Sequence, residues 1–171
     1  MAWYGVDYTC GHSDRMQVYG PTRDRQAIAD REGRKDCPNC YREKQDKIRD
    51  AAADVAAKEA VAKGLPELAG STAQIKWALT LRAKAEGNIA LALARYSEAL
   101  NQNALAAAPL VVPPFDEFVA FANRVLRQNS AKYWIDRRDS FVDANSTSRY
   151  LFRRASEEHD KATGAAMLCG R

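Results

Sequence analysis

Residues 71–100 read STAQIKWALTLRAKAEGNIALALARYSEAL, a run with one glycine and no proline. Ser71 and Gln74 fit a capping box, in which the serine side chain accepts the third amide and the glutamine reaches back. After Gly87 the apolar residues step by 4, 3 and 4, as Ile89, Leu93, Tyr96 and Leu100. This spacing places them on one face of a helix. The run therefore predicts a long amphipathic helix at the centre of the fold.

The predicted central helix extends from residue 72 to residue 107. Its 36 residues would span roughly 54 Å at the α-helical rise. That length is large for a small domain, so we expect either a break at Gly87-Asn88 or an antiparallel helical partner.

Amphipathic segments on both sides extend the helical pattern. We expect helices near residues 41–63, 72–107, 115–129, 130–142 and 149–160, and a short charged helix near 23–34. Gly64-Leu65-Pro66 ends the helix at 41–63, because glycine favours the position after a helix and proline cannot continue one. The polar stretch 143–148 is expected to separate the last two helices, and the tail from Thr163 is expected to fray. The predicted fold class is mostly α, with a helical domain at residues 43–171.

The N-terminal segment has a different pattern. Alternating residues around Tyr4 to Tyr8 and Met16 to Gly20 predict two short strands. The turn between the strands contains Cys10-Gly11-His12, and 24 residues later the chain reads Cys37-Pro38-Asn39-Cys40. The spacing predicts two turns that each offer two ligands, as in a β-hairpin-like zinc ribbon at residues 1–42.

Four tetrahedral ligands, Cys10, His12, Cys37 and Cys40, complete a structural zinc site that is closed to substrate. Zinc binding would also supply folding free energy to a segment of about 40 residues with few large apolar side chains. Two alternatives stay open: disulfides or a redox pair formed by the cysteines, and an ordinary surface role for His12. A redox pair normally follows a core strand in a thioredoxin-like unit, and no such pattern is present.

Length, composition and charge bound the function. The chain has 171 residues, is 46% hydrophobic and 9% aromatic, and carries 26 basic and 22 acidic residues. The net charge of +4 is spread over the whole chain, so any basic surface has to be assembled by folding. No apolar stretch approaches the ~18 residues of a membrane span. Because the N-terminus lacks the pattern of a secretory signal, we expect a cytoplasmic protein with reduced cysteines.

Two further blocks accompany the metal motif: Gly70-Ser71-Thr72-Ala73-Gln74-Ile75-Lys76-Trp77-Ala78 and Ser130-Ala131-Lys132-Tyr133-Trp134-Ile135-Asp136-Arg137-Arg138. With Cys-Gly-His and Cys-Pro-x-Cys, the arrangement resembles a group of small uncharacterised proteins of bacteria, phages and plasmids. The resemblance covers about half of the chain. It implies a mobile-element setting and no particular activity.

The first functional hypothesis is a non-enzymatic protein that binds nucleic acid, or a complex that handles it, through phosphate neutralisation. The candidate contacts are basic residues near the metal motif and in a second stretch: Arg15, Arg23, Arg25, Arg34, Lys35, Arg42, Arg149, Arg153 and Arg154. Pairing of Arg153 with Glu157 and of Arg154 with Glu158 would instead make the second stretch a solvated face.

The second hypothesis is a protein-interaction module that inhibits or redirects a host defence complex through its helical surface, or that self-associates through the Ala-rich stripe. An enzyme is not expected, because histidines and convergent acids are scarce. His159 and Cys169 make a poor catalytic pair, since the cysteine lies in the tail. Trp77 and Trp134, at helical positions, are expected to be core residues rather than a ligand-binding pair.

Overall fold

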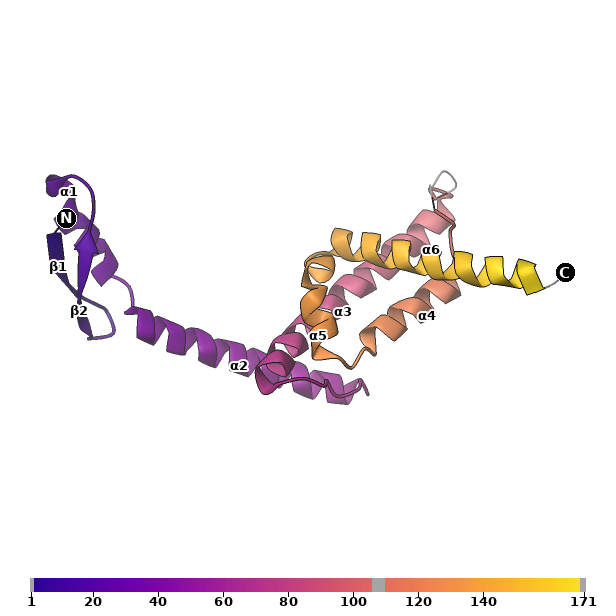
Figure 1. The fold of residues 1–171 in the computed structure, drawn as a ribbon, viewed down its shortest axis with the longest axis horizontal. Coiled ribbons are helices and arrows are strands. Elements are labelled where there is room, and N and C mark those ends of the chain that lie inside the picture. The colour runs from indigo at the N-terminus through magenta and orange to yellow at the C-terminus, as the bar shows by residue number, and fades with distance from the viewer. Residues whose placement is uncertain (1, 106–109, 170–171) are drawn as a thin grey trace. The chain divides into compact units, whose positions relative to one another are not determined.

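The structure is a computed structural model that describes residues 2–105 and 110–169, with the side chains of these residues up to position 164. The expectation of a mostly α chain with a small N-terminal hairpin is confirmed (Figure 1). The chain divides into two compact units, Met1–Ala51 and Ala52–Arg171, called here the N-terminal and C-terminal units. No helix in the described part of the chain is long and apolar enough to cross a membrane.

The N-terminal unit is built on a β-hairpin. Strands β1 (Ala2–Asp7) and β2 (Ser13–Val18) pair antiparallel, with Ala2 opposite Val18 and Asp7 opposite Ser13. Alternation buries one face, which includes Val6 and Val18, and helix α1 (Thr22–Gly33) contributes Ala29 to the same small core. The predicted strands and the short charged helix are therefore confirmed.

Helix α2 (Pro38–Ala62) begins three residues before its predicted start and crosses the boundary between the two units. Proline suits the first position of a helix because its missing N–H would have no helical partner there. The helix ends close to its predicted end, where Gly64 and Leu65 donate to carbonyls of the last turn.

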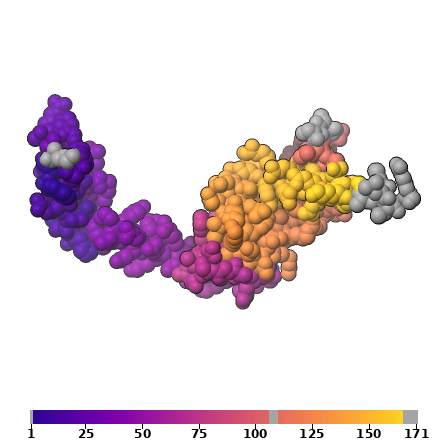
Figure 2. Space-filling view, in the orientation of Figure 1, coloured from indigo at the N-terminus to yellow at the C-terminus, as the bar shows by residue number. Residues whose placement is uncertain are grey.

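The C-terminal unit is organised around helix α3 (Thr72–Asn101), which begins with the predicted Ser71–Gln74 capping box. Helices α4 (Phe115–Leu126), α5 (Ala131–Asp136) and α6 (Ala144–Cys169), with the 3-10 turn η1 (Arg138–Phe141), pack around α3. On the face seen in Figure 2, the orange and yellow side chains of α4, α5 and α6 form most of the surface of this unit.

The core of the C-terminal unit is a continuous apolar cluster. Small residues of α3, including Ala78, Ala85 and Ala92, let the larger side chains of the other helices approach closely. The larger members are Ile89, Tyr96, Phe118, Phe121, Trp134, Phe141 and Leu151. The predicted stripe of α3 therefore faces the core of its own unit.

Several predicted helix boundaries are wrong. Helix α3 does not break at Gly87-Asn88, and it ends at Asn101; part of the predicted remainder, residues 106–107, lies outside the described residues. Asn103 adopts a left-handed conformation with φ of 52°, which asparagine tolerates and a helix does not. Helix α4 ends at Leu126 rather than 129, because Asn129 and Ala131 form a backbone bridge with Ala69.

The predicted helix at 130–142 is divided into α5 and η1. The division is stabilised by side chains, since the Asn88 amide donates to the Phe141 carbonyl and the Thr147 hydroxyl donates to the Ser140 carbonyl. The predicted break at 143–148 is instead a helix start. The Asp143 carboxylate accepts the amides of Asn145 and Ser146, and α6 continues to Cys169 instead of ending at 160.

Two glycine-to-alanine substitutions are expected to change the free energy of unfolding of the C-terminal unit in opposite directions. A Cβ on Gly70 would lie 2.9 Å from the Ala131 Cβ, whereas a Cβ on Gly87 would meet nothing within 4 Å. Overpacking at Gly70 should destabilise the unit by roughly 1–3 kcal/mol. Alanine at Gly87, inside α3, should stabilise it by about 0.5–1 kcal/mol. Denaturant unfolding of both variants tests this, and a stabilised Gly70→Ala would contradict the described packing.

Candidate metal centre

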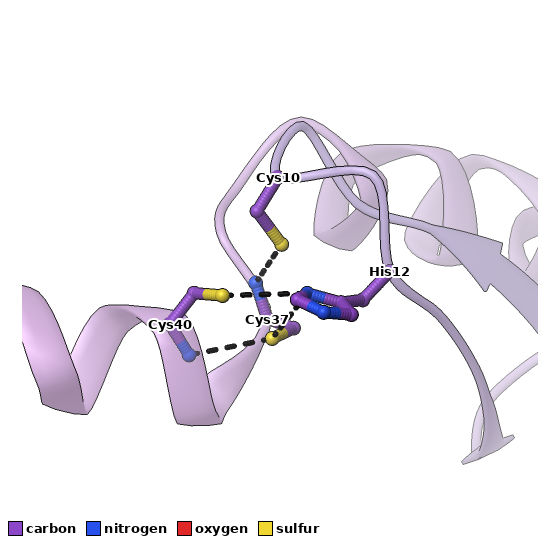
Figure 3. Close-up of side chains that lie close together, drawn as sticks. All are labelled: Cys10, His12, Cys37 and Cys40. Atoms are coloured by element: carbon purple, nitrogen blue, oxygen red, sulfur yellow. Dashed lines mark hydrogen bonds between the residues drawn. The ribbon is translucent and has the colours of Figure 1, made fainter.

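The first two candidate ligands lie in the turn that joins β1 to β2. The Tyr8 amide donates to the His12 carbonyl at 2.9 Å and the Gly11 amide donates to the Tyr8 carbonyl at 3.0 Å, which closes the turn tightly. Gly11 has a φ of 81°, a conformation that a residue with a Cβ rarely adopts. The side chains of Cys10 and His12 leave this turn toward a common point (Figure 3).

The second two candidate ligands lie at the start of α2. Cys37 immediately precedes Pro38, its carbonyl accepts the Tyr41 amide at 2.9 Å, and Cys40 falls in the first helical turn. The predicted second turn is therefore the beginning of a helix. A hydrogen bond of 3.0 Å from the Thr9 amide to the Lys35 carbonyl joins the segment before α2 to the hairpin turn.

The four side chains converge on one point, as Figure 3 shows. Their ligand atoms all lie within 4.8 Å of one another. The His12 Nδ1 is 3.3 Å from the Cys40 Sγ and 3.7 Å from the Cys37 Sγ. Atoms bound tetrahedrally at about 2.3 Å from an ion are about 3.8 Å apart. Cys10, His12, Cys37 and Cys40 are thus close enough to hold one metal ion, and the three cysteines are free thiols, without a disulfide.

Hydrogen bonding makes the thiols electrostatically unequal. The backbone amide of Cys37, 3.2 Å from the Cys10 sulfur, and the amide of His12 lower the pKa of Cys10 to about 6. Hydrogen bonding with the Cys37 side chain, partial burial and the nearby sulfurs raise the pKa of Cys40 to about 12. Without a metal, Cys10 therefore becomes a thiolate more readily than Cys40 does, and a bound cation would favour the thiolate form of both.

The basic residues predicted near the motif lie around the N-terminal unit, and several already have partners. Arg23 lies 3.6 Å from Asp24, Lys35 lies 2.6 Å from Glu32, and the Arg25 Nε donates to the Gly20 carbonyl. Arg15 is exposed on β2, and Arg34 and Arg42 are exposed before and within α2.

The second predicted basic stretch lies on α6 in the C-terminal unit. Arg154 and Arg153 both approach Glu157, at 2.6 and 3.9 Å, which makes this part of α6 a salt-bridged face. Glu158, the predicted partner of Arg154, pairs instead with Arg124 of α4. The side chain of Arg149, one turn earlier, forms no ion pair or hydrogen bond with the described residues, although its charge interacts with Asp143.

The remaining candidates have separate positions. His159 Nδ1 lies 2.6 Å from a Glu117 carboxylate oxygen, which joins α6 to α4. The side chain of Cys169 lies outside the described residues. Trp134 is fully buried, as expected of a core residue, whereas Trp77 is 48% exposed.

Sequence reasoning missed two exposed aromatic residues beside the hairpin. Trp3 is 60% exposed and Tyr19 is 61% exposed. The signal was available for Trp3, because Tyr4 and Val6 are alternate residues of one strand face and the residue before Tyr4 therefore points to the opposite, outer face.

No protein-family model matches this chain, and no curated protein or solved structure shows significant similarity to it. The resemblance to uncharacterised mobile-element proteins therefore stays a prediction, and functional inference depends on the chemistry of the chain itself.

Proposed function

We propose that the four-residue cluster holds one structural Zn²⁺. Three sulfurs and one imidazole nitrogen form a donor set that zinc favours over magnesium or calcium. Four protein ligands leave no open position for substrate, which supports a non-catalytic role. The ion would join the hairpin turn to the start of α2 and thereby hold the two halves of the N-terminal unit together.

The zinc is expected to dissociate on acidification, because metal binding requires thiolates and protons compete with the ion for the sulfurs. In the metal-free unit, the hydrogen bonds that lower the pKa of Cys10 to about 6 stabilise the fold fully above the ordinary thiol pKa. That stabilisation decreases as the pH falls and is lost as the pH passes through about 6. Zinc release can be followed with a chromophoric chelator during acid titration. Complete retention at about pH 4 would contradict this expectation.

We further propose that the N-terminal unit binds single-stranded nucleic acid through the outer face of its hairpin. The observation that supports this is the exposed pair Trp3 and Tyr19 next to Arg15. Trp3 lies opposite Gln17 on the neighbouring strand, and the Tyr19 hydroxyl donates to the Gln17 side chain at 2.8 Å. Both aromatic residues are therefore associated with Gln17, Trp3 by strand pairing and Tyr19 by a hydrogen bond.

The same face offers room and charge for a nucleotide chain. Gly5 lies opposite Arg15, and a Cβ on Gly5 would meet nothing within 4 Å. Exposed aromatic rings stack on unpaired bases, and arginine neutralises phosphate. The metal beneath the hairpin turn would keep this face rigid, so less conformational entropy is lost on binding. The exposed Arg34 and Arg42 are additional candidate phosphate contacts.

Replacing Trp3 with alanine is expected to weaken binding of a labelled dodecanucleotide about 5- to 100-fold, the loss typical of one base-stacking ring. Trp77→Ala, which removes an exposed tryptophan from the C-terminal unit, should leave the affinity unchanged. Fluorescence anisotropy measures the affinity, and its repetition at several salt concentrations gives the number of phosphate contacts. Each phosphate contact should contribute about −0.7 to the log–log salt slope.

Two results would overturn the nucleic-acid proposal. One is a lack of binding at low salt, and the other is an equal loss in the two tryptophan variants. The zinc content of each variant is measured as well. A variant that keeps its zinc but binds nucleic acid more weakly has lost a binding residue, whereas a variant that loses zinc has lost the fold of the N-terminal unit.

A second candidate function, inhibition or redirection of a host complex in a mobile-element setting, is favoured by helix α2. Its residues Tyr41, Ile48 and Val55 are 58%, 62% and 56% exposed. Their spacing of seven places them on one side of the helix, as in a surface that receives another helix. Pull-down from host lysate tests this candidate. Ile48→Glu should abolish capture without weakening nucleic-acid binding, and capture that survives the substitution argues against it.

A further inference from the structure

A cavity of about 440 Å³ lies in the C-terminal unit between α3, α4 and α6. Its volume falls within the range of about 300–1,000 Å³ typical of small-molecule sites. Its floor is aromatic, because Tyr96 stacks on Phe118 with ring centroids 4.0 Å apart and Phe152 lies 5.9 Å from Tyr96. Ala92, Ala99 and Leu105 complete an apolar lining. The interior thus suits a hydrocarbon or aromatic body.

The rim of the cavity is basic. Arg95 comes from α3 and Arg149 from α6, so arginines of two different helices line the same cavity. Arg95 donates to the Asn145 side-chain oxygen at 2.6 Å, a neutral partner that leaves its charge uncompensated. Arg149 forms no ion pair with any described residue. Among the described residues that line the cavity, none carries a carboxylate.

The carboxylate of Asp143 interacts electrostatically with Arg149, but it already accepts hydrogen bonds from the backbone. Asp143 accepts the amides of Asn145 and Ser146 at 2.8 Å as the cap of α6, and these bonds, with a smaller contribution from Arg149, lower its pKa. The rim therefore retains an excess of positive charge over an apolar chamber. A ligand with an anionic group at the rim and an apolar body below it would match both the positive charge of the arginines and the apolar lining.

We propose that this cavity binds an amphipathic carboxylate, a small molecule with one acidic head and a medium-length acyl body. Its head is held by Arg95 and Arg149, whose planar guanidinium groups match a carboxylate in geometry and charge. Its body lies against Tyr96, Phe118 and Phe152. The site is independent of the metal centre and of the hairpin face.

The test is isothermal titration calorimetry on the zinc-loaded 171-residue chain. The two probes, decanoate and decan-1-ol, have the same chain length and are used below their solubility limits and below the micelle concentration of decanoate. Decanoate is expected to bind one-to-one and about tenfold or more tighter than the alcohol, because only the acid pairs with the arginines. Arg149→Gln and Arg95→Gln should each weaken decanoate about tenfold and leave decan-1-ol unchanged.

Two control variants distinguish binding in the cavity from general effects of charge or folding. Arg153→Gln removes a charge from the same helix outside the cavity and should leave decanoate affinity intact. Ala99→Phe should fill the chamber and abolish binding of both probes while circular dichroism shows a folded helical unit. No decanoate binding, equal affinity for acid and alcohol, or an equal loss in Arg153→Gln would each overturn the assignment.

Discussion

Cys37→Ser is expected to release the metal and unfold residues 3–42 while helices α3 to α6 stay folded. Cys37 is the most deeply buried of the four ligands, and its sulfur and amide contact the other three residues. Structural zinc contributes on the order of 10–16 kcal/mol to the folding of small metal-dependent units. The buried apolar residues near the hairpin, mainly Val6, Val18 and Ala29, are too few to replace that contribution.

Hydrogen exchange read by mass spectrometry measures this effect segment by segment. The N-terminal unit of Cys37→Ser should exchange at the rate of an unfolded chain, and the core peptides of α3 and α6 should keep their protection. Cys169→Ser is the matched control, since it removes a thiol that has no predicted metal role. A Cys37→Ser chain that retains one equivalent of zinc would falsify the ligand assignment.

Trp134→Ala is expected to destabilise the C-terminal unit by about 3–5 kcal/mol, as large-to-small substitutions of buried aromatic residues do. Trp134 is completely buried, its ring packs near Tyr133 and Phe141, and its N–H donates to the Gln128 carbonyl at 3.1 Å. Its removal would leave a cavity in the core cluster of the C-terminal unit. The zinc content of the variant should stay at one equivalent, because the ligands belong to the other unit.

Thermal denaturation followed by circular dichroism at helical wavelengths measures the loss. Trp77→Ala provides the comparison, because Trp77 is 48% exposed on α3 and its ring covers less buried surface. We expect a loss of less than about 1 kcal/mol for Trp77→Ala. Equal destabilisation by the two substitutions would contradict the described core.

The features that the sequence predicted correctly depend on local chemistry. The capping box at Ser71, the stripe from Ile89 to Leu100 and the two ligand pairs are short patterns with one dominant physical solution. The spacing of the cysteines and the histidine predicted that they would meet, and the structure brings Cys10, His12, Cys37 and Cys40 close enough to hold a metal ion.

The features that sequence reasoning missed depend on contacts between distant segments. The extended bridge at Ala69 and Ser130 ends α4 early, and the Asn88 side chain helps to divide the helix after it. Neither effect is encoded in the local pattern. The polar residues from Asp143 onward predict a break between helices, but they cap the start of α6 instead. The two cases look alike in sequence because Asp, Asn, Ser and Thr favour both turns and helix caps. The pairing of Glu158 with Arg124 rather than Arg154 likewise required the packing of α6 on α4.

The measurement that tests the central claim most directly is the native mass of the purified 171-residue chain, before and after dialysis against a strong zinc chelator. The account predicts the mass of the chain plus one zinc ion, and loss of that ion together with loss of hydrogen-exchange protection in residues 3–42. A metal-free chain with the same protection in the N-terminal unit would contradict the claim that a metal holds the hairpin to α2.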